Sequence, residues 1–116
     1  MAGIYHNPAS PEEAARNLQA IGAHNVVVTL GSKGSLLVPS TSASVFAPGF
    51  AVRAVDTTAA GDGFVGALAV ALAEGAQPSD ALRWGNAAGA LAVTREGAQP
   101  SLPNRAEVEQ FLMSQT

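Results

Sequence analysis

A run of β-branched residues at 25–30, Asn-Val-Val-Val-Thr-Leu, most constrains the fold of this chain. Valine and threonine favour strands, and a short continuous apolar run is typical of a buried strand of the kind found in parallel sheets. A glycine-rich break at 31–34 follows, and further short strands are expected at 36–38, 45–47 and 50–55. Helical segments flank these strands, so the order of elements predicts an α/β fold.

Four helices are predicted. The first begins at Ser10, whose side chain can cap it. Two apolar helices are expected at 61–74 and 79–93, each ended by a glycine or a polar turn. The last begins at Asn104, which can form a capping box with Glu107. All of these elements fit one domain over residues 1–116.

The composition indicates a folded chain with unusually few surface charges. Apolar residues make up 47% of the chain and charged residues only 13%, about half the usual charged share. Either part of the surface is covered by another segment, or the chain is simply rich in alanine. A buried strand with only hairpin neighbours makes a poor sheet, so we expect the sequence to be part of a larger protein.

Charge and hydropathy exclude several classes of function. The net charge is −3, and the six basic residues form no stripe that could neutralise a phosphate backbone, so no nucleic-acid partner is expected. The longest apolar stretch, 64–73, is too short to span a bilayer. The start of the chain lacks a signal-peptide pattern, and there are no cysteines. These features predict a cytoplasmic protein with no membrane partner.

The segment 56–64, Asp-Thr-Thr-Ala-Ala-Gly-Asp-Gly-Phe, is the candidate site. Its small residues allow a ligand to approach the backbone, and it runs directly into a predicted helix. Free N–H groups and the positive end of the helix dipole attract anions there. A phosphate could therefore bind the amides of Ala60, Gly61 and Asp62. The alternative is that Asp62 merely caps the helix.

The residue order of this segment resembles the signature of the ribokinase-like, phosphofructokinase-B-type carbohydrate kinases, and the match continues through Gly66-Ala67-Leu68. The resemblance implies a ribokinase-like three-layer sandwich, of which this chain is the C-terminal, nucleotide-binding part. It implies that Asp62 contacts the sugar and is the base that accepts the proton of its hydroxyl group. It also implies that Gly61 and Ala60 line an anion hole for the transferred phosphoryl group.

The same resemblance implies a nucleotide site, because residues 28–34 are similar to the strand and turn that line the family's ATP pocket. The implied nucleotide contacts are Thr29, Leu30, Gly31, Ser32, Lys33, Gly34, Gly61, Asp62 and Asn86. Two alternatives stay open. The glycines of the turn would serve any tight hairpin, and Asn86 could be a buried, hydrogen-bonded side chain that packs its helix.

A monovalent cation, usually potassium, is a further implication of the resemblance. Its implied ligands, mostly backbone carbonyls, are at Asp56, Thr58, Ala92, Arg95, Gly97 and Ser101. Oxygen ligands suit such a hard cation. The alternative is that 94–101 is a plain loop. ATP and Mg²⁺ are implied as cofactors beside K⁺.

The implied reaction is ATP-dependent phosphorylation of a sugar hydroxyl, with D-ribose giving ribose 5-phosphate as the expected case. The sugar-binding motif, the lid through which the full-length protein would form a homodimer, and most of the parallel sheet would lie in an absent N-terminal part. We therefore expect this chain alone to be inactive. The alternatives are a non-catalytic piece that at most binds nucleotide, and a kinase for another sugar or a nucleoside.

Overall fold

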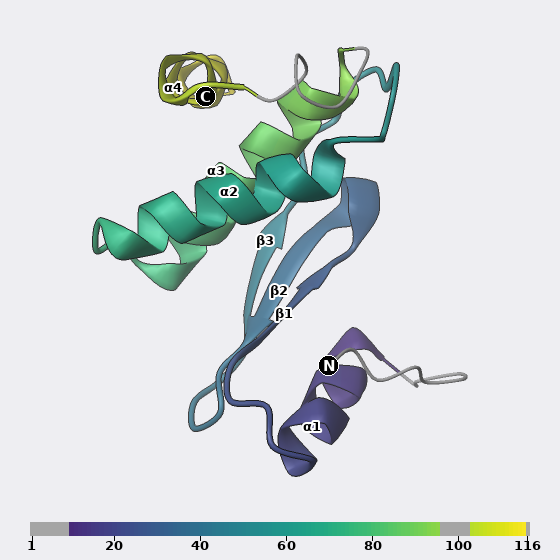
Figure 1. Cartoon of the computed structure of the whole chain (residues 1–116), viewed down its shortest axis with the longest axis vertical. Coiled ribbons are helices and arrows are strands. Elements are labelled where there is room, and N and C mark those ends of the chain that lie inside the picture. The colour runs from purple at the N-terminus through teal and green to yellow at the C-terminus, as the bar shows by residue number, and fades with distance from the viewer. Residues whose placement is uncertain (1–9, 96–102, 116) are drawn as a thin grey trace.

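The computed structural model of the chain describes residues 10–95 and 103–115 (Figure 1). A three-stranded antiparallel sheet in the order β1-β2-β3 lies between helices. In Figure 1 the α2–α3 pair crosses one end of the strands, and α1 lies at the other end. In chain order the elements are α1 (Pro11–Ala20), β1 (Val26–Thr29), η1 (Gly31–Lys33), β2 (Gly34–Val38), β3 (Val45–Pro48), α2 (Ala60–Ala73), α3 (Pro78–Val93) and α4 (Arg105–Met113).

Helix α1 begins where the sequence predicts. The Ser10 hydroxyl oxygen accepts the amide of Glu13 at 3.1 Å, and this satisfies one of the free donors of the first turn. Two side chains then attach α1 to β2 and the residue after it. Gln19 donates to the Val38 carbonyl at 2.8 Å, and Arg16 donates to the Pro39 carbonyl at 2.9 Å.

Strand β1 differs from its prediction. It pairs antiparallel with β2, with Val26 opposite Val38, and it has a neighbour on one side only in the sheet that the structure describes. Its residues alternate between half-buried and exposed, and Val27 is 36% exposed. A buried, parallel-type strand was therefore the wrong expectation for this chain. The short turn at η1 makes β2 the nearest partner, and consecutive strands joined by a short turn must pair antiparallel.

The strand predicted at 50–55 is also absent from the described structure. Residues 50–54 form no ladder, although they are rich in apolar side chains. The amides of Val55 and Asp56 donate to the carbonyl oxygen of Val93 at the end of α3, at 2.6 and 3.0 Å. The backbone amides at the end of this segment therefore donate to the end of a helix and not to a neighbouring strand.

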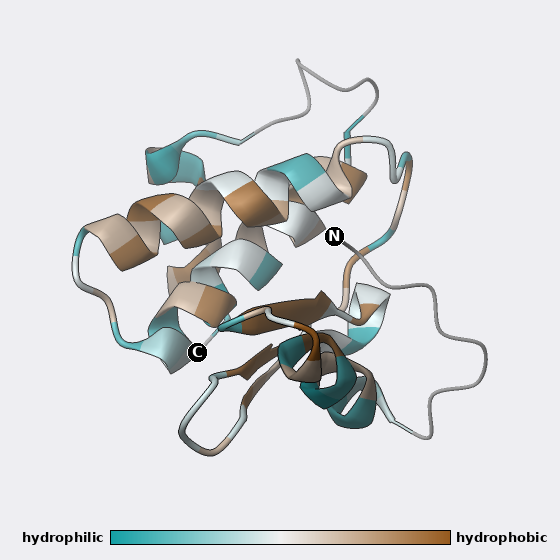
Figure 2. Cartoon of the chain, turned by 60° about the horizontal axis from the view of Figure 1, so that its bottom comes forward, coloured by the Kyte–Doolittle hydropathy of each residue, from teal (hydrophilic) through white to brown (hydrophobic). Residues whose placement is uncertain are grey.

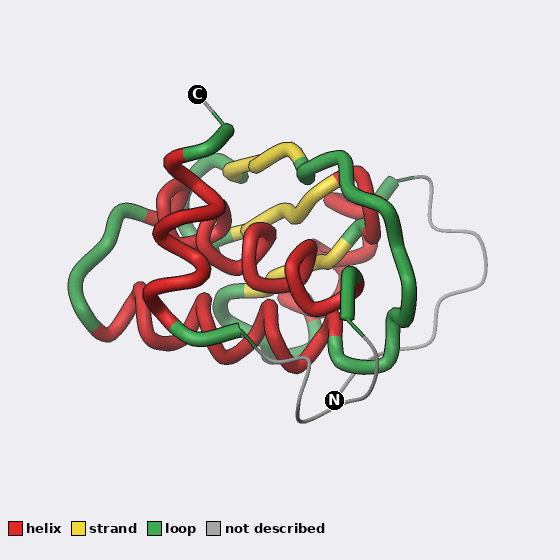
Figure 3. The backbone as a smooth tube through the Cα atoms, turned by 90° about the horizontal axis from the view of Figure 1, so that it is seen from above, coloured by secondary structure: helices red, strands yellow, loops and turns green. Residues whose placement is uncertain are grey.

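Helices α2 and α3 pack closely because small residues face each other. A Cβ atom added at Gly85 would lie 2.7 Å from the ring of Phe64. Phe64 forms one core cluster with Ala47 of β3 and Leu82 of α3. A second cluster joins α3 to Val108 of α4. Figure 3, which views the chain from above, shows the two long helices lying side by side.

The outer side of α2 keeps large apolar side chains in solvent. Val65 is 62% exposed and Leu72 is 46% exposed. Figure 2 shows that hydrophobic segments recur along α2, whereas α1 is mostly hydrophilic. In the described parts of the chain, no helix is both long and apolar enough to cross a membrane.

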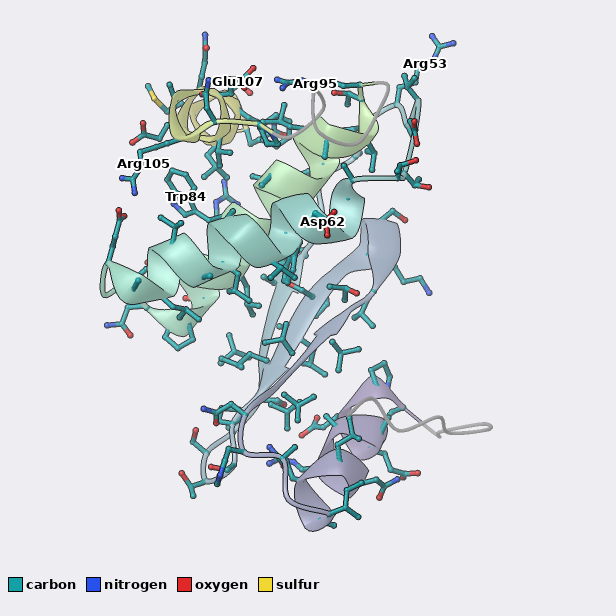
Figure 4. The ribbon with its side chains drawn as sticks, viewed as in Figure 1. Arg53, Asp62, Trp84, Arg95, Arg105 and Glu107 are labelled. Carbon is teal, nitrogen blue, oxygen red and sulfur yellow. The ribbon has the colours of Figure 1, made fainter. Side chains whose placement is uncertain are left out.

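Helix α4 begins with the predicted capping box. The Asn104 side chain accepts the amide of Glu107 at 2.9 Å, and the Glu107 carboxylate accepts the amide of Asn104 at 3.0 Å. Glu107 also forms an ion pair with Arg95, which follows α3 (Figure 4). The Arg95 guanidinium, together with the Asn104 amide, lowers the pKa of Glu107 from its ordinary value of 4.5.

We predict that Leu82→Ala will lower the free energy of unfolding by about 2–5 kcal/mol, because the side chain is fully buried and its loss leaves a cavity. The matched control is Leu72→Ala on the exposed side of α2, which should cost roughly 1 kcal/mol. Urea denaturation of both variants measures the difference. Equal costs would contradict the placement of the core.

We predict that the Glu107 carboxylate stabilises the fold at neutral pH and stops doing so in acid. Its pKa is lower in the folded chain than in the unfolded chain, so its contribution is full above pH 4.5 and is lost as the pH falls through the folded value. The stability difference between the parent chain and Glu107→Gln should therefore shrink below pH 4.5. Glu109→Gln, on the same helix, is the matched control, because the ion pair with Arg95 is made by Glu107. Thermal unfolding across the acid range measures both, and a constant difference would contradict the prediction.

Candidate functional site

The turn between β1 and β2 lies in direct contact with the segment after β3. Gly34 has φ of +125°, and a Cβ atom there would lie 2.0 Å from the carbonyl oxygen of Ala47. Gly49 is also crowded, since its Cβ atom would lie 2.3 Å from the carbonyl oxygen of Ser32. The tight hairpin that the glycines suggested is thus present. Its glycines also let two backbones touch, so the turn is fixed in position.

The segment before α2 is ordered by Asp56. Its backbone is anchored to the end of α3, as described above. Its carboxylate accepts the amide of Thr58 at 2.8 Å and also the Thr58 hydroxyl. An acidic side chain that bonds the backbone two residues on is a common way to fix a turn. The chain therefore enters α2 from a defined position.

The first turn of α2 has two free amides. The Ala60 amide donates to the Thr57 carbonyl at 3.2 Å. The amides of Gly61 and Asp62 have no acceptor among the described residues. Of the three amides predicted to bind a phosphate, two are therefore available. They lie at the positive end of a 14-residue helix, where an anion is stabilised.

Asp62 is not the cap of α2. Ala59 occupies the capping position, and none of the described side chains caps the helix. The Asp62 carboxylate is exposed in the first turn and makes no hydrogen bond or ion pair within residues 10–95 and 103–115. In Figure 4 it projects from the start of α2, away from the other labelled side chains. The capping alternative is thus not what the structure shows, and the carboxylate is accessible to a ligand.

A cavity of about 570 Å³ brings most of the predicted nucleotide residues together. Its lining joins the turn after β1 to the start of α2 and the middle of α3. Of the predicted residues it includes Thr29, Gly31, Ser32, Gly34, Ala60, Gly61 and Asn86. Leu30 and Lys33, in the same turn, are not among its lining residues. A volume of this size is within the range of small-molecule sites.

Asp62 lines a second cavity, of about 420 Å³, between α2, α3 and α4. Trp84 and Arg105 lie on the far side of this cavity, and Arg105 forms an ion pair with Glu74. The start of α2 therefore separates two cavities. Gly61 belongs to the first and Asp62 to the second.

The sequence left open whether Asn86 contacts a nucleotide or is a hydrogen-bonded side chain that packs its helix. The structure shows a half-buried side chain with several hydrogen bonds. Its side-chain nitrogen donates to the carbonyls of Ala47 and Pro48, at 3.0 and 3.1 Å. Its oxygen accepts the hydroxyl of Ser35 at 2.8 Å. Asn86 thus attaches α3 to β2 and β3, and it also lines the larger cavity.

Sequence reasoning missed the apolar wall of the larger cavity, in which Phe50 and Val93 take part. Phe50 is held by α4, because its ring meets that of Phe111 edge to face at 5.1 Å. The guanidinium of Arg83 lies 5.0 Å from the centre of the Phe50 ring. The sequence predicted a strand at 50–55, but nothing in it signalled that a distant helix would hold the ring of Phe50.

The residues predicted to hold a cation are only partly described. Asp56 and Thr58 lie close to the end of α3 because Asp56 bonds the Val93 carbonyl, and Ala92 and Arg95 belong to that same end. The carbonyl of Ala92 accepts the Arg95 amide at 3.3 Å. Gly97 and Ser101 lie outside the described residues. Within the described ranges, no three His, Cys, Asp or Glu side chains form a metal cluster.

We predict that Gly34→Ala will destabilise the chain by about 3 kcal/mol or more, because a rare backbone conformation and a backbone contact both oppose the added methyl group. Gly31→Ala is the control. Gly31 also has positive φ, of +60°, but open space surrounds it, so the cost should be only about 1–2 kcal/mol. Chemical denaturation measures both, and equal costs would show that the two backbones do not touch.

Comparison with known proteins gives three informative matches. The ribokinase of Haemophilus influenzae is 44% identical over 103 residues, which are 89% of this chain and 33% of that protein. The fructokinase of Vibrio alginolyticus is 41% identical over 107 residues, with 84% and 34% covered. The solved structure of Arabidopsis thaliana ribokinase complexed with ribose and ATP matches with a TM-score of 0.82 at 40% identity, covering 86% of this chain and 32% of that one.

The chain spans about a third of the length of the curated relatives it matches. The agreement in backbone shows that its α/β architecture is part of a ribokinase-like fold. The model of the family described as "pfkB family carbohydrate kinase" matches residues 2–105. With nearly the whole chain covered, the resemblance seen in the segment 56–68 is confirmed, and the chain belongs to the pfkB family of carbohydrate kinases.

Proposed function

We propose that this chain supplies the nucleotide- and phosphoryl-binding part of a kinase that transfers the γ-phosphoryl group of ATP to D-ribose, giving ribose 5-phosphate. The observation that carries the proposal is the cavity shared by the glycine turn, Asn86 and the start of α2. The turn and the α3 residues would contact the nucleoside, and the free amides of α2 would contact its phosphates. The similar Arabidopsis ribokinase, solved with ribose and ATP, supports both ligands.

Asp62 would act as the base. Its exposed carboxylate accepts the proton of the sugar hydroxyl while the hydroxyl oxygen attacks the γ-phosphorus, and the bond from that phosphorus to the oxygen of ADP breaks. The amides of Gly61 and Asp62 donate to the phosphoryl oxygens, where charge accumulates in transfer. Because Gly61 and Asp62 line different cavities, the phosphoryl donor and the sugar would approach the helix start from two sides.

Two cations belong to the proposal. Mg²⁺ bound to the phosphates of ATP would neutralise part of their charge, as it does in phosphoryl transfer generally. K⁺ would be held by oxygen atoms at the six predicted positions, four of which are described near the end of α3. Oxygen atoms are the ligands that such a cation prefers. A homodimer and a cytoplasmic location stay predictions for the longer protein.

A second candidate function is nucleotide binding without transfer. The described residues offer a cavity beside Asp62 that is lined mainly by apolar and small residues, whereas a sugar site needs many polar groups. The chain also spans only a third of its relatives. The similarity to a fructokinase supports a sugar other than ribose as an alternative substrate of the complete protein.

ADP formation tests whether the chain alone can catalyse the transfer. The purified, folded chain is given ATP, Mg²⁺ and K⁺ with ribose, with fructose, or with no sugar, and nucleotide binding is followed by calorimetry. Ribose-dependent turnover would show that the chain itself is the kinase. Binding of ATP without turnover is the expected result. It agrees with both candidates, which are then separated by the turnover of a hybrid enzyme that joins this chain to the rest of a ribokinase. A folded chain that binds no ATP would contradict the proposal.

We predict that Asp62→Asn will reduce turnover by about 10²–10⁴-fold with little change in ATP affinity, because the amide cannot accept the proton. The test replaces the matched segment of the Haemophilus ribokinase by this chain, with and without the substitution. Glu109→Gln, on the exposed side of α4, is the control and should leave turnover unchanged. Equal turnover with Asp62 and with Asn at that position would remove Asp62 from the mechanism.

A further inference from the structure

Ser35 is the one polar or charged side chain that is fully buried in the described parts of the chain. It lies in β2, and its side chain points toward α3. Burying a hydroxyl group costs free energy unless it is hydrogen-bonded. Its partner is the side-chain oxygen of Asn86, at 2.8 Å. No step of the proposed reaction uses Ser35, so this bond requires another explanation.

The hydrogen bonds of Asn86 leave it only one way to contact a ligand. A side-chain amide has two N–H donors and two acceptor positions on its oxygen. Both donors are taken, by the carbonyls of Ala47 and Pro48. The hydroxyl of Ser35 takes one acceptor position. One acceptor position on the oxygen therefore remains, and Asn86 lines the larger cavity.

The orientation of this amide is fixed by the sheet. Reversing it would place its oxygen against two carbonyl oxygens of β3, which cannot donate. Ser35 holds the oxygen from the other side, since its hydroxyl is the donor that the amide oxygen faces. The amide thus has its donors directed at β3 and its oxygen shared between Ser35 and the cavity.

We propose that Asn86 selects, among nucleotides, those that present a hydrogen-bond donor to it, and that Ser35 is the residue that positions its oxygen. This inference rests on the proposed function, because it requires that the larger cavity holds the nucleotide. The donor on the ligand is either the exocyclic amino group of the base or a hydroxyl group of the ribose. A group that can only accept, such as a ring carbonyl, would face the oxygen of Asn86 without a hydrogen bond.

The experiment measures the affinity of the folded chain for ATP, ITP and 2′-deoxy- and 3′-deoxy-ATP by calorimetry. ITP carries a carbonyl where ATP carries the amino group, and each deoxy nucleotide lacks one hydroxyl group. We expect one of the three analogues to bind about 3- to 10-fold more weakly than ATP, as for the loss of one neutral hydrogen bond. Weaker binding of ITP assigns the amino group, and weaker binding of a deoxy nucleotide assigns that hydroxyl group. Equal affinity for all four would overturn the inference.

Ser35→Ala tests the positioning role. In this variant the affinity for ATP, divided by the affinity for the analogue that binds the parent chain more weakly, should fall toward 1. A loss of stability alone would not change this ratio. Ser79→Ala, on the exposed start of α3, is the matched control and should keep the ratio. An unchanged ratio in folded Ser35→Ala would overturn the role of Ser35. A folded parent chain that binds none of the nucleotides would instead contradict the proposed function.

Discussion

The close packing of α2 against α3 is the constraint on which the candidate site depends. Gly85 meets the ring of Phe64, and a Cβ atom at Gly89 would lie 3.3 Å from the carbonyl oxygen of Ala60. Any larger side chain at these positions would push the helices apart. The same packing sets where α2 begins relative to the cavity. The free amides therefore owe their position to small residues of the neighbouring helix.

The sequence predicted the helices better than the strands, for a physical reason. Caps and glycine stops act within a few residues, and the capping box at Asn104 formed as expected. A strand needs a partner that its own residues do not specify. The run at 25–30 became an edge strand, and 50–55 bonded a helix end, because the available backbone partners decided the outcome.

The candidate site, too, could be predicted from the sequence only in part. The signature segment pointed to Gly61 and Asp62 through the order of its residues, and in the structure the Gly61 amide is free and the Asp62 carboxylate is exposed among the described residues. The arrangement of two cavities on either side of that helix start could not be predicted, since it depends on where α4 packs. Nor could Ser35 be found, because a serine in a strand carries no signal until its partner on another element is known.

The free side of β1 has a practical consequence. Within the described sheet this strand bonds β2 alone, so a row of backbone donors and acceptors at Val26–Thr29 remains open on its other side. Such an edge is a template that any extended peptide can join, including the same strand of a second molecule. Any ligand titration of this chain therefore depends on the protein concentration. A binding constant is calculated for the folded monomer, and pairing of β1 between two molecules would reduce the amount of that monomer.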